Sequence, residues 1–224
     1  MHWIQKHIMQ ELSTHVSCRY SELKPRSVEG NLFMYHMQQL RKDDYVRKDT
    51  GGYVLSQKGK LFSGRMSLRQ GSALMQPKIV AMLVCQDVKG DYLLFRWTRQ
   101  PYRGLVSFPF SKVHFGRTIV ETLQEAFFYK TNLKGSFAYV GDIYIKVLGK
   151  NKETDDHMLA HIYRVTDMEG VLGGHDGLTG QPFWGRPKDI PTNEQVPGFI
   201  NVLEVVGSGA QGFMREVVVD QPND

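Results

Sequence analysis

The spacing of apolar residues changes near Pro77, and this change constrains the fold more than any other feature. Before Pro77, apolar side chains recur at helical intervals, as in Ile4, Ile8 and Leu12. After it, the nearly continuous apolar run from Ile79 to Cys85 is typical of a buried strand. With 224 residues, the chain is long enough for two hydrophobic cores. We therefore predict two domains, residues 1–70 and 77–210, followed by a C-terminal tail at 211–224.

The charges divide at the same boundary. The chain has a net charge of +5, but residues 1–75 hold 12 Lys and Arg against 6 Asp and Glu, and the remainder is nearly neutral. A basic excess is informative about nucleic acid only when it is clustered. Here the whole excess lies in the first domain, which makes that domain the candidate for binding nucleic acid.

The first domain has the signals of three helices and a hairpin. A proline at position 25 ends the second helix, and the paired glycines at 51 and 52 suit a tight turn. Ser56 is positioned to cap a closing helix that includes Leu61 and Phe62. The expected elements are a helix ending near Thr14, a short helix from Tyr20, a helix over about 29–41, strands at 45–48 and 53–55, and the closing helix.

This order of elements resembles the winged helix-turn-helix domains of bacterial regulators. The stretch Tyr35–Leu40 followed by Tyr45 and Val46 is similar to their recognition helix running into the wing. In that family the third helix enters the major groove and the wing lies against phosphates. The resemblance implies that DNA is contacted by Asn31, Tyr35, Gln38 and Arg41 on the helix, by Arg47 and Lys48 on the wing, and by Lys58 and Lys60.

Three alternatives remain open for this basic face. It is an ordinary solvated surface, as most charge runs are. It binds RNA, since phosphate contacts of the same kind serve both nucleic acids. Or it docks a protein, because the apolar residues Leu32 and Met34 fall on the side expected to face DNA.

The second domain alternates strands with two helices. Its strands are expected at 79–85, 92–97, 139–148 and 158–164, one helix at about 118–131, and a last helix after Pro197. The segment Phe108–Gly116 resembles the loop that leads into the helix of the Nudix hydrolases, an α/β/α fold. The expected fold class is therefore α+β, a winged helix-turn-helix domain followed by a Nudix-like α/β/α sandwich with a mixed sheet.

The catalytic motif of that family is degenerate in this chain. The motif asks for a glycine, a glutamate after five residues, and, after seven more, an arginine and three further glutamates that gather Mg²⁺ or Mn²⁺. Only its two apolar positions are kept. The motif falls on Ser111, Arg117, Glu125, Ala126, Phe127, Tyr129, Lys130, Asn132 and Leu133. We therefore expect no metal, no other cofactor and no catalysis of the ordinary kind.

The chain could still be an enzyme if its active site used residues other than those at the motif positions. Glu121 and Glu125 lie four residues apart on one helix, within reach of a cation shared with His114. Two carboxylates are too few, and an exposed helix face explains the pair better. The acidic cluster at 153–157 suits a polar turn equally well.

Regulators that join a winged helix to a Nudix domain sense NAD-derived compounds such as ADP-ribose, with the two domains in the opposite order. The resemblance therefore implies a DNA-binding regulator whose inactive Nudix-like domain binds a nucleotide or phosphorylated metabolite. Lys112, Arg117 and Lys130 would supply the positive charge that metals give in the enzymes. Stacking against a base is expected from Phe110, Phe115 or Trp184.

Two further hypotheses stay open. The Nudix-like domain is a scaffold for homodimerisation or partner binding, or it is a hydrolase with a nonstandard site. The two cysteines, Cys18 and Cys85, fall in different domains, so a disulfide framework is not expected. The longest apolar run is too short to cross a bilayer and no signal peptide is apparent, so we expect a cytoplasmic protein without a membrane partner.

Overall fold

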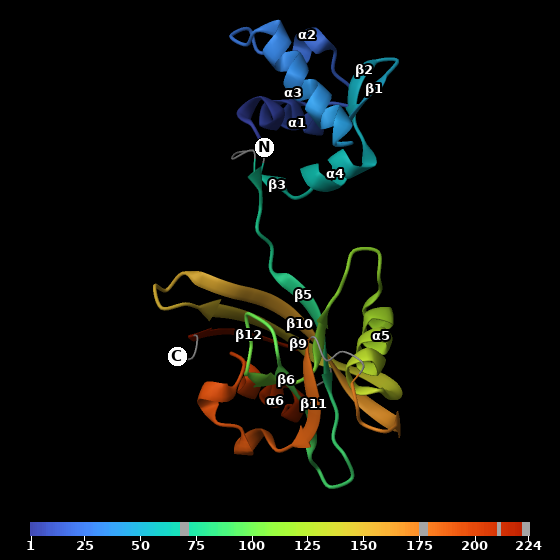
Figure 1. Cartoon of the computed structure of the whole chain (residues 1–224), viewed down its shortest axis with the longest axis vertical. Helices are drawn as coiled ribbons and strands as arrows, with labels where there is room; N and C mark the ends of the chain where they lie inside the picture. The colour runs from blue at the N-terminus through green and yellow to red at the C-terminus, as the bar shows by residue number, and fades with distance from the viewer. Residues whose placement is uncertain (68–71, 175–178, 210–211, 221–224) are drawn as a thin grey trace. The chain divides into compact units, whose positions relative to one another are not determined.

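The computed structural model describes residues 1–67, 72–174, 179–209 and 212–220 (Figure 1). The chain separates into two compact units, Met1–Met75 and Gln76–Asp224. Among the described residues, no helix combines the length and the apolar character needed to cross a membrane.

The first unit consists of helices around one apolar core and a two-stranded hairpin. The predicted face of α3, with Phe33, Met37 and Leu40, is buried against Ile4 and Ile8 of α1. The expected bounds of the third helix and of the two hairpin strands are confirmed to within two residues, and β3 and β4 are additional to the predicted elements. The elements are α1 (Trp3–Thr14), α2 (Tyr20–Leu23), α3 (Gly30–Lys42), β1 (Val46–Asp49), β2 (Gly52–Leu55), α4 (Gln57–Ser63), β3 (Met66–Ser67) and β4 (Ser72–Ala73).

The hairpin is fixed to the segment between α1 and α2. Cys18 and Tyr53 exchange two backbone hydrogen bonds of 3.0 and 2.8 Å, which add a single bridge to the β1–β2 pair. Gly52 has a φ of +134°, and a Cβ there would lie 2.4 Å from the Cys18 carbonyl oxygen. Only glycine fits this turn. Ser56 caps α4 as predicted, accepting a hydrogen bond from the Gly59 N–H at 3.0 Å.

The second unit is built on a five-stranded mixed sheet in the order β12-β9-β10-β5-β8. The β10–β5 and β12–β9 pairs are parallel and the others are antiparallel. The strands of this sheet are β5 (Lys78–Val84), β8 (Phe110–Lys112), β9 (Leu133–Leu148), β10 (Thr154–Gly170) and β12 (Phe213–Asp220). A smaller sheet has the order β11-β6-β7, with β6 (Tyr92–Trp97), β7 (Val106–Ser107) and β11 (Gly180–Gly185).

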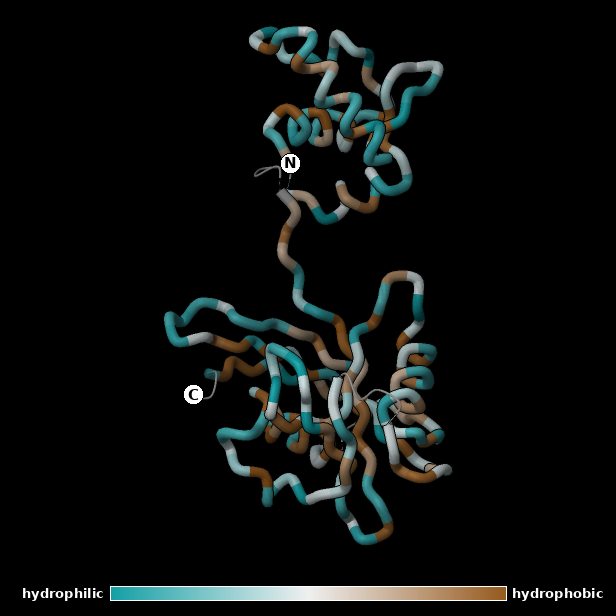
Figure 2. The backbone as a smooth tube through the Cα atoms, in the orientation of Figure 1, coloured by the Kyte–Doolittle hydropathy of each residue, from teal (hydrophilic) through white to brown (hydrophobic). Residues whose placement is uncertain are grey.

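Two helices cover opposite faces of the large sheet (Figure 1). Helix α5 (Ile119–Thr131) packs Leu123 and Phe127 on the face that carries Ala81 and Leu83. Helix α6 (Phe199–Gly207) contributes to the core on the other face, which the smaller sheet also covers. Short 3-10 turns at Pro187–Asp189 and Thr192–Glu194 precede α6. The tip of the β9–β10 hairpin is exposed and hydrophilic (Figure 2).

The end of the chain differs from the sequence-based expectation. Residues 213–220 form strand β12, where the sequence predicts a tail. This strand pairs in parallel with β9, from Phe213 opposite Gly141 to Asp220 opposite Leu148. Val217 and Val219 pack against the core, while the alternate residues are exposed. The strand is stabilised by this non-local pairing, which a short edge segment does not reveal in its own sequence.

Both cysteines are buried and unpaired by disulfides, one in each unit. Burial raises the pKa of the Cys85 thiol to about 12, partly opposed by a backbone hydrogen bond from Leu93. Because the thiolate is the reactive form, this raised pKa disfavours reaction of Cys85 at neutral pH.

Candidate functional site

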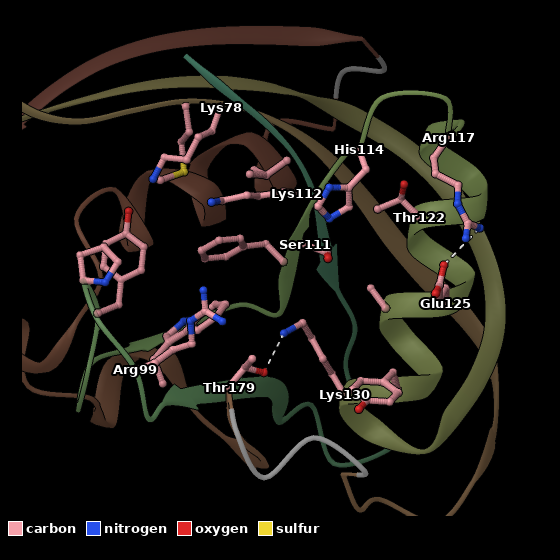
Figure 3. Close-up of a pocket in the computed structure, with 18 of the residues that line it drawn as sticks. Lys78, Arg99, Ser111, Lys112, His114, Arg117, Thr122, Glu125, Lys130 and Thr179 are labelled. Atoms are coloured by element: carbon pink, nitrogen blue, oxygen red, sulfur yellow. Dashed lines mark hydrogen bonds and ion pairs between the residues drawn. The ribbon is translucent and has the colours of Figure 1, made fainter. Parts of the chain in front are cut away.

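A cavity of about 800 Å³ in the second unit is bordered by α5, by the edge strand β8 of the large sheet and by the loop after β6 (Figure 3). Its walls come from distant parts of the sequence: the start of β5, the loop after β6, strand β8 with the loop that follows, and α5. A volume of this size suits a nucleotide-sized ligand. The cavity is therefore the candidate ligand site of the second unit.

The cavity wall is strongly basic. Five of its residues are lysine or arginine, and among the described lining residues the only carboxylate is that of Glu125. The cationic residues are Lys78, Arg99, Lys112, Arg117 and Lys130. Such a wall favours an anionic ligand, provided that the cations are not already neutralised by neighbouring carboxylates.

Two of the five cations are neutralised. Arg117 lies 3.2 Å from the Glu125 carboxylate, and both side chains are more than half exposed. Lys78 Nζ lies 2.5 Å from Asp156, whose carboxylate also accepts a hydrogen bond from the buried Tyr102 hydroxyl. Burial acts to raise the pKa of Asp156, but the hydrogen bonds from Lys78 and Tyr102 outweigh it and hold that pKa below its ordinary value. Burial and the Asp156 hydrogen bond raise the pKa of Tyr102.

Lys112 and Arg99 are the uncompensated cations. Neither side chain has a hydrogen bond or ion pair with any residue in the described part of the chain. Lys112 ends β8 and Arg99 follows β6, and Figure 3 shows both side chains directed into the cavity from different walls. Their charges are available to a ligand.

Lys130 lies at the base of the same cavity and is 8% exposed. Its Nζ donates a 3.2 Å hydrogen bond to the Thr179 hydroxyl and sits 4.7 and 5.0 Å from the ring centres of Phe95 and Trp97. The negative faces of aromatic rings attract an ammonium group, which helps to hold the charge in a buried place. This part of the cavity is therefore lined by a fixed cation.

The ends of α5 are set by local signals. The Thr118 hydroxyl accepts a 3.2 Å hydrogen bond from the Glu121 N–H, and the Glu121 carboxylate accepts one of 2.8 Å from the Thr118 N–H. These bonds lower the pKa of Glu121. At the other end, Asn132 adopts the left-handed conformation, with φ of +59°. Asn132 occupies the glycine position of the motif, and asparagine is one of the few residues that tolerate this conformation.

The motif positions do not suit a divalent cation. Arg117, Ala126, Tyr129 and Lys130 stand where the family has glutamates, and all four line the cavity. Within the described ranges, no group of three His, Cys, Asp or Glu gathers as metal ligands. Glu121 caps its own helix and Glu125 pairs with Arg117, so the pair considered with His114 is already engaged.

The structure brings together most of the ligand residues predicted from sequence. Lys112, Arg117, Lys130, Phe110 and Phe115 all line the cavity. Trp184 does not: it lies on β11 and packs against the core beneath α5. The sequence predicts Trp184 only as an aromatic side chain able to stack on a base, whereas in the structure Trp184 pairs with Leu93 on β6 and packs against the core.

Sequence reasoning missed Lys78, Arg99 and Tyr102, and it assigned Asp156 to a polar turn, whereas Asp156 lies on β10 and pairs with Lys78. Lys78 and Asp156 are nearly eighty residues apart in sequence, and the parallel β10–β5 pairing places them next to each other. Arg99 had one weak signal, since it precedes Gln100 and Pro101 in a loop directly after a strand.

In the first unit, the predicted DNA contacts lie on exposed positions. Tyr35 is 55% exposed and Leu32 is 47% exposed on the same helix, while Met34 is half-buried. Lys58 is held in place: its Nζ donates to the Asp43 carbonyl at 2.7 Å and lies over the Tyr45 ring. The other exposed positions are Asn31, Gln38, Arg41, Arg47, Lys48 and Lys60.

Comparison with known proteins gives a fold for the second unit. No protein-family model matches the sequence, and no curated protein matches it. The Nudix domain of Shewanella oneidensis NrtR, in complex with ADP ribose, superposes with a TM-score of 0.50 at 10% identity. The match covers 69% of this chain and 98% of the NrtR domain.

The chain contains a Nudix-like fold. Two MutT proteins align with slightly lower scores. The MutT Nudix hydrolase from Burkholderia pseudomallei has a TM-score of 0.49 at 16% identity, covering 59% of this chain and 99% of its own. The MutT protein from Methanosarcina mazei Go1 has a TM-score of 0.49 at 14% identity, covering 62% of this chain and 100% of its own. At these identities the likeness concerns the fold alone.

Proposed function

We propose that this protein is a DNA-binding transcriptional regulator whose Nudix-like domain binds a nucleotide or phosphorylated metabolite without hydrolysing it. The observation that carries the proposal is the basic cavity, in which Lys112 and Arg99 are uncompensated and Lys130 is buried. Fixed cations of this kind bind phosphate oxygens through charge-assisted hydrogen bonds.

The same residues argue against hydrolysis by the family mechanism. That mechanism needs carboxylates that hold divalent cations, which activate the attacking water. Arginine and lysine at those positions repel such ions. Binding without turnover is the behaviour expected of a sensor.

The DNA-binding half of the proposal is supported by the first unit. It has the helices and hairpin expected of a winged helix-turn-helix domain, with exposed basic residues on the hairpin and on the helix that precedes it. Arg47 and Lys48 on β1 would contact phosphates, and Tyr35 and Gln38 on α3 would reach base edges. A homodimer would suit two-fold symmetric DNA sites, and light scattering on the DNA complex measures it.

The test is the affinity of the full chain for the intergenic DNA upstream of its own gene, against scrambled DNA, at about 150 mM salt. ADP-ribose is the first ligand to add, because it is bound by the NrtR Nudix domain. We expect preferential binding to the upstream DNA and a change of about fivefold or more with ADP-ribose. Preference for an RNA of the same sequence would instead assign the first unit to RNA.

Arg47→Ala and Tyr35→Ala should lose the preference. The matched control is Arg26→Ala, an exposed arginine of the same unit outside the predicted contact set. Equal or absent binding to both DNAs would reject the regulator. In that case Leu32 and Met34 would be the first residues to test as a protein-docking surface.

A further inference from the structure

We infer that the cavity of the second unit recognises its phosphorylated ligand directly through protein cations and needs no divalent metal ion. This inference rests on the proposed function and specifies how the ligand is held. The ligand class is a diphosphate, with at least two negative charges to distribute between separate walls of the cavity.

The first step is that the acidic and the basic residue of one motif pair have swapped positions in this chain, as Arg117 and Glu125. The motif has glutamate at the position of Arg117 and arginine at the position of Glu125, and the two residues here form an ion pair of 3.2 Å. The ion pair between these two motif positions is therefore retained, with the positive and negative side chains exchanged. It places a guanidinium on the cavity side of α5, and it removes Glu125 as a potential metal ligand.

The second step is the position of Lys130. It occupies a glutamate position of the motif, and its amino group is buried between Thr179 and the rings of Phe95 and Trp97. Charges inside a partly desolvated site interact more strongly than charges in water. A lysine ammonium has no lone pair with which to coordinate a divalent cation, so this position of the motif supplies a hydrogen-bond donor in place of a metal ligand.

The third step is the arrangement of three cavity cations, of which Arg99 and Lys112 are uncompensated. Arg99 reaches the cavity from the loop after β6, Lys112 from β8, and Lys130 from α5. Figure 3 shows the three side chains converging from different sides. A single phosphate has one centre of charge, but a diphosphate presents two, and so engages cations on more than one wall. The guanidinium of Arg99 is suited to bidentate contact with phosphate oxygens.

Calorimetric titration of the full chain with ADP-ribose and with inorganic pyrophosphate tests the inference, once in EDTA and once in excess Mg²⁺. We expect both probes to bind in EDTA, and Mg²⁺ to weaken binding by about twofold or more, because it neutralises the phosphate charge that the protein cations attract. Binding in Mg²⁺ alone would overturn the inference and leave the proposed sensor intact. No binding in either buffer would reject the sensor itself.

Variants locate the site. Lys112→Gln and Arg99→Gln should each reduce ADP-ribose affinity by about tenfold or more, the cost expected for losing a charged hydrogen bond. Both positions are exposed, so the variants should fold. The matched controls are Lys89→Gln, on the turn before β6, and Arg103→Gln, in the same loop as Arg99, because neither lines the cavity. Equal losses in variants and controls would show nonspecific charge attraction and overturn the inference.

Discussion

At the scale of single residues, the cavity depends on which charges are paired. Arg117 and Glu125 neutralise each other, as do Lys78 and Asp156, which leaves Lys112 and Arg99 as the uncompensated cations of the cavity wall. The sequence identified Lys112 and Lys130 because they lie within the segment that resembles the Nudix motif. It did not identify Arg99 or the Lys78–Asp156 pair, because their proximity arises from strand pairing rather than from spacing along the chain.

The Arg117–Glu125 pair leads to a first prediction. Arg117→Glu or Glu125→Arg alone should lower the free energy of unfolding by about 0.5–1 kcal/mol, because like charges replace an exposed ion pair. The double variant should recover most of this loss, as the opposite charges face each other again. Urea unfolding of the four proteins measures the coupling. Additive losses in the double variant would show that the two side chains do not interact in solution.

Asp156 leads to a second prediction, on pH. Its folded-state pKa is depressed, so its contribution to stability is present above its unfolded pKa of about 4 and is lost as the pH falls through the folded value. Asp156→Asn should therefore destabilise the protein near neutral pH and remove part of the loss of stability seen on acidification below about pH 4. Melting temperatures from pH 7 to pH 2.5 test this, with Asp155→Asn, an exposed neighbour, as control. Parallel curves for wild type and Asp156→Asn would contradict it.

At the scale of elements, the helices that are set by local signals were predicted from the sequence. The strands that depend on pairing with distant segments were missed or predicted too short. The helices of the first unit and α5 were predicted within two residues, because their caps and apolar spacing are local. Strand β12 was missed because its stability comes from β9, about seventy residues earlier in the chain. The extensions of β9 and β10 beyond the predicted strands have the same origin, since the two pair with each other over most of their length.

The cap of α5 gives a third prediction. Thr118→Ala removes the hydroxyl that accepts from the Glu121 N–H and should destabilise the second unit by about 1 kcal/mol. Thr118→Ser keeps the hydroxyl and should stay close to wild type. Thermal unfolding followed by circular dichroism distinguishes them. A loss of equal size in both variants would mean that packing of the threonine methyl, and not the cap, is what matters.

At the scale of the whole molecule, the proposed regulator requires that the two units communicate. Linkage makes any such coupling reciprocal: if ADP-ribose changes the affinity for DNA by some factor, DNA must change the affinity for ADP-ribose by the same factor. This holds whatever path carries the coupling. A coupling factor that differs from one therefore tests the molecule as a regulator without reference to the arrangement of its units.

The last prediction combines both sites. Lys112→Gln should leave the DNA affinity of the ligand-free protein unchanged, because Lys112 belongs to the second unit, and should shift the ADP-ribose response to higher ligand concentration. Arg47→Ala should weaken DNA binding and leave the ADP-ribose affinity of the DNA-free protein unchanged. Fluorescence anisotropy with labelled DNA and calorimetry with ADP-ribose give the four affinities. If ADP-ribose leaves the DNA affinity of the wild type unchanged, or if Lys112→Gln alone alters DNA binding, ADP-ribose does not act through the cavity and the regulatory mechanism proposed for this protein is wrong.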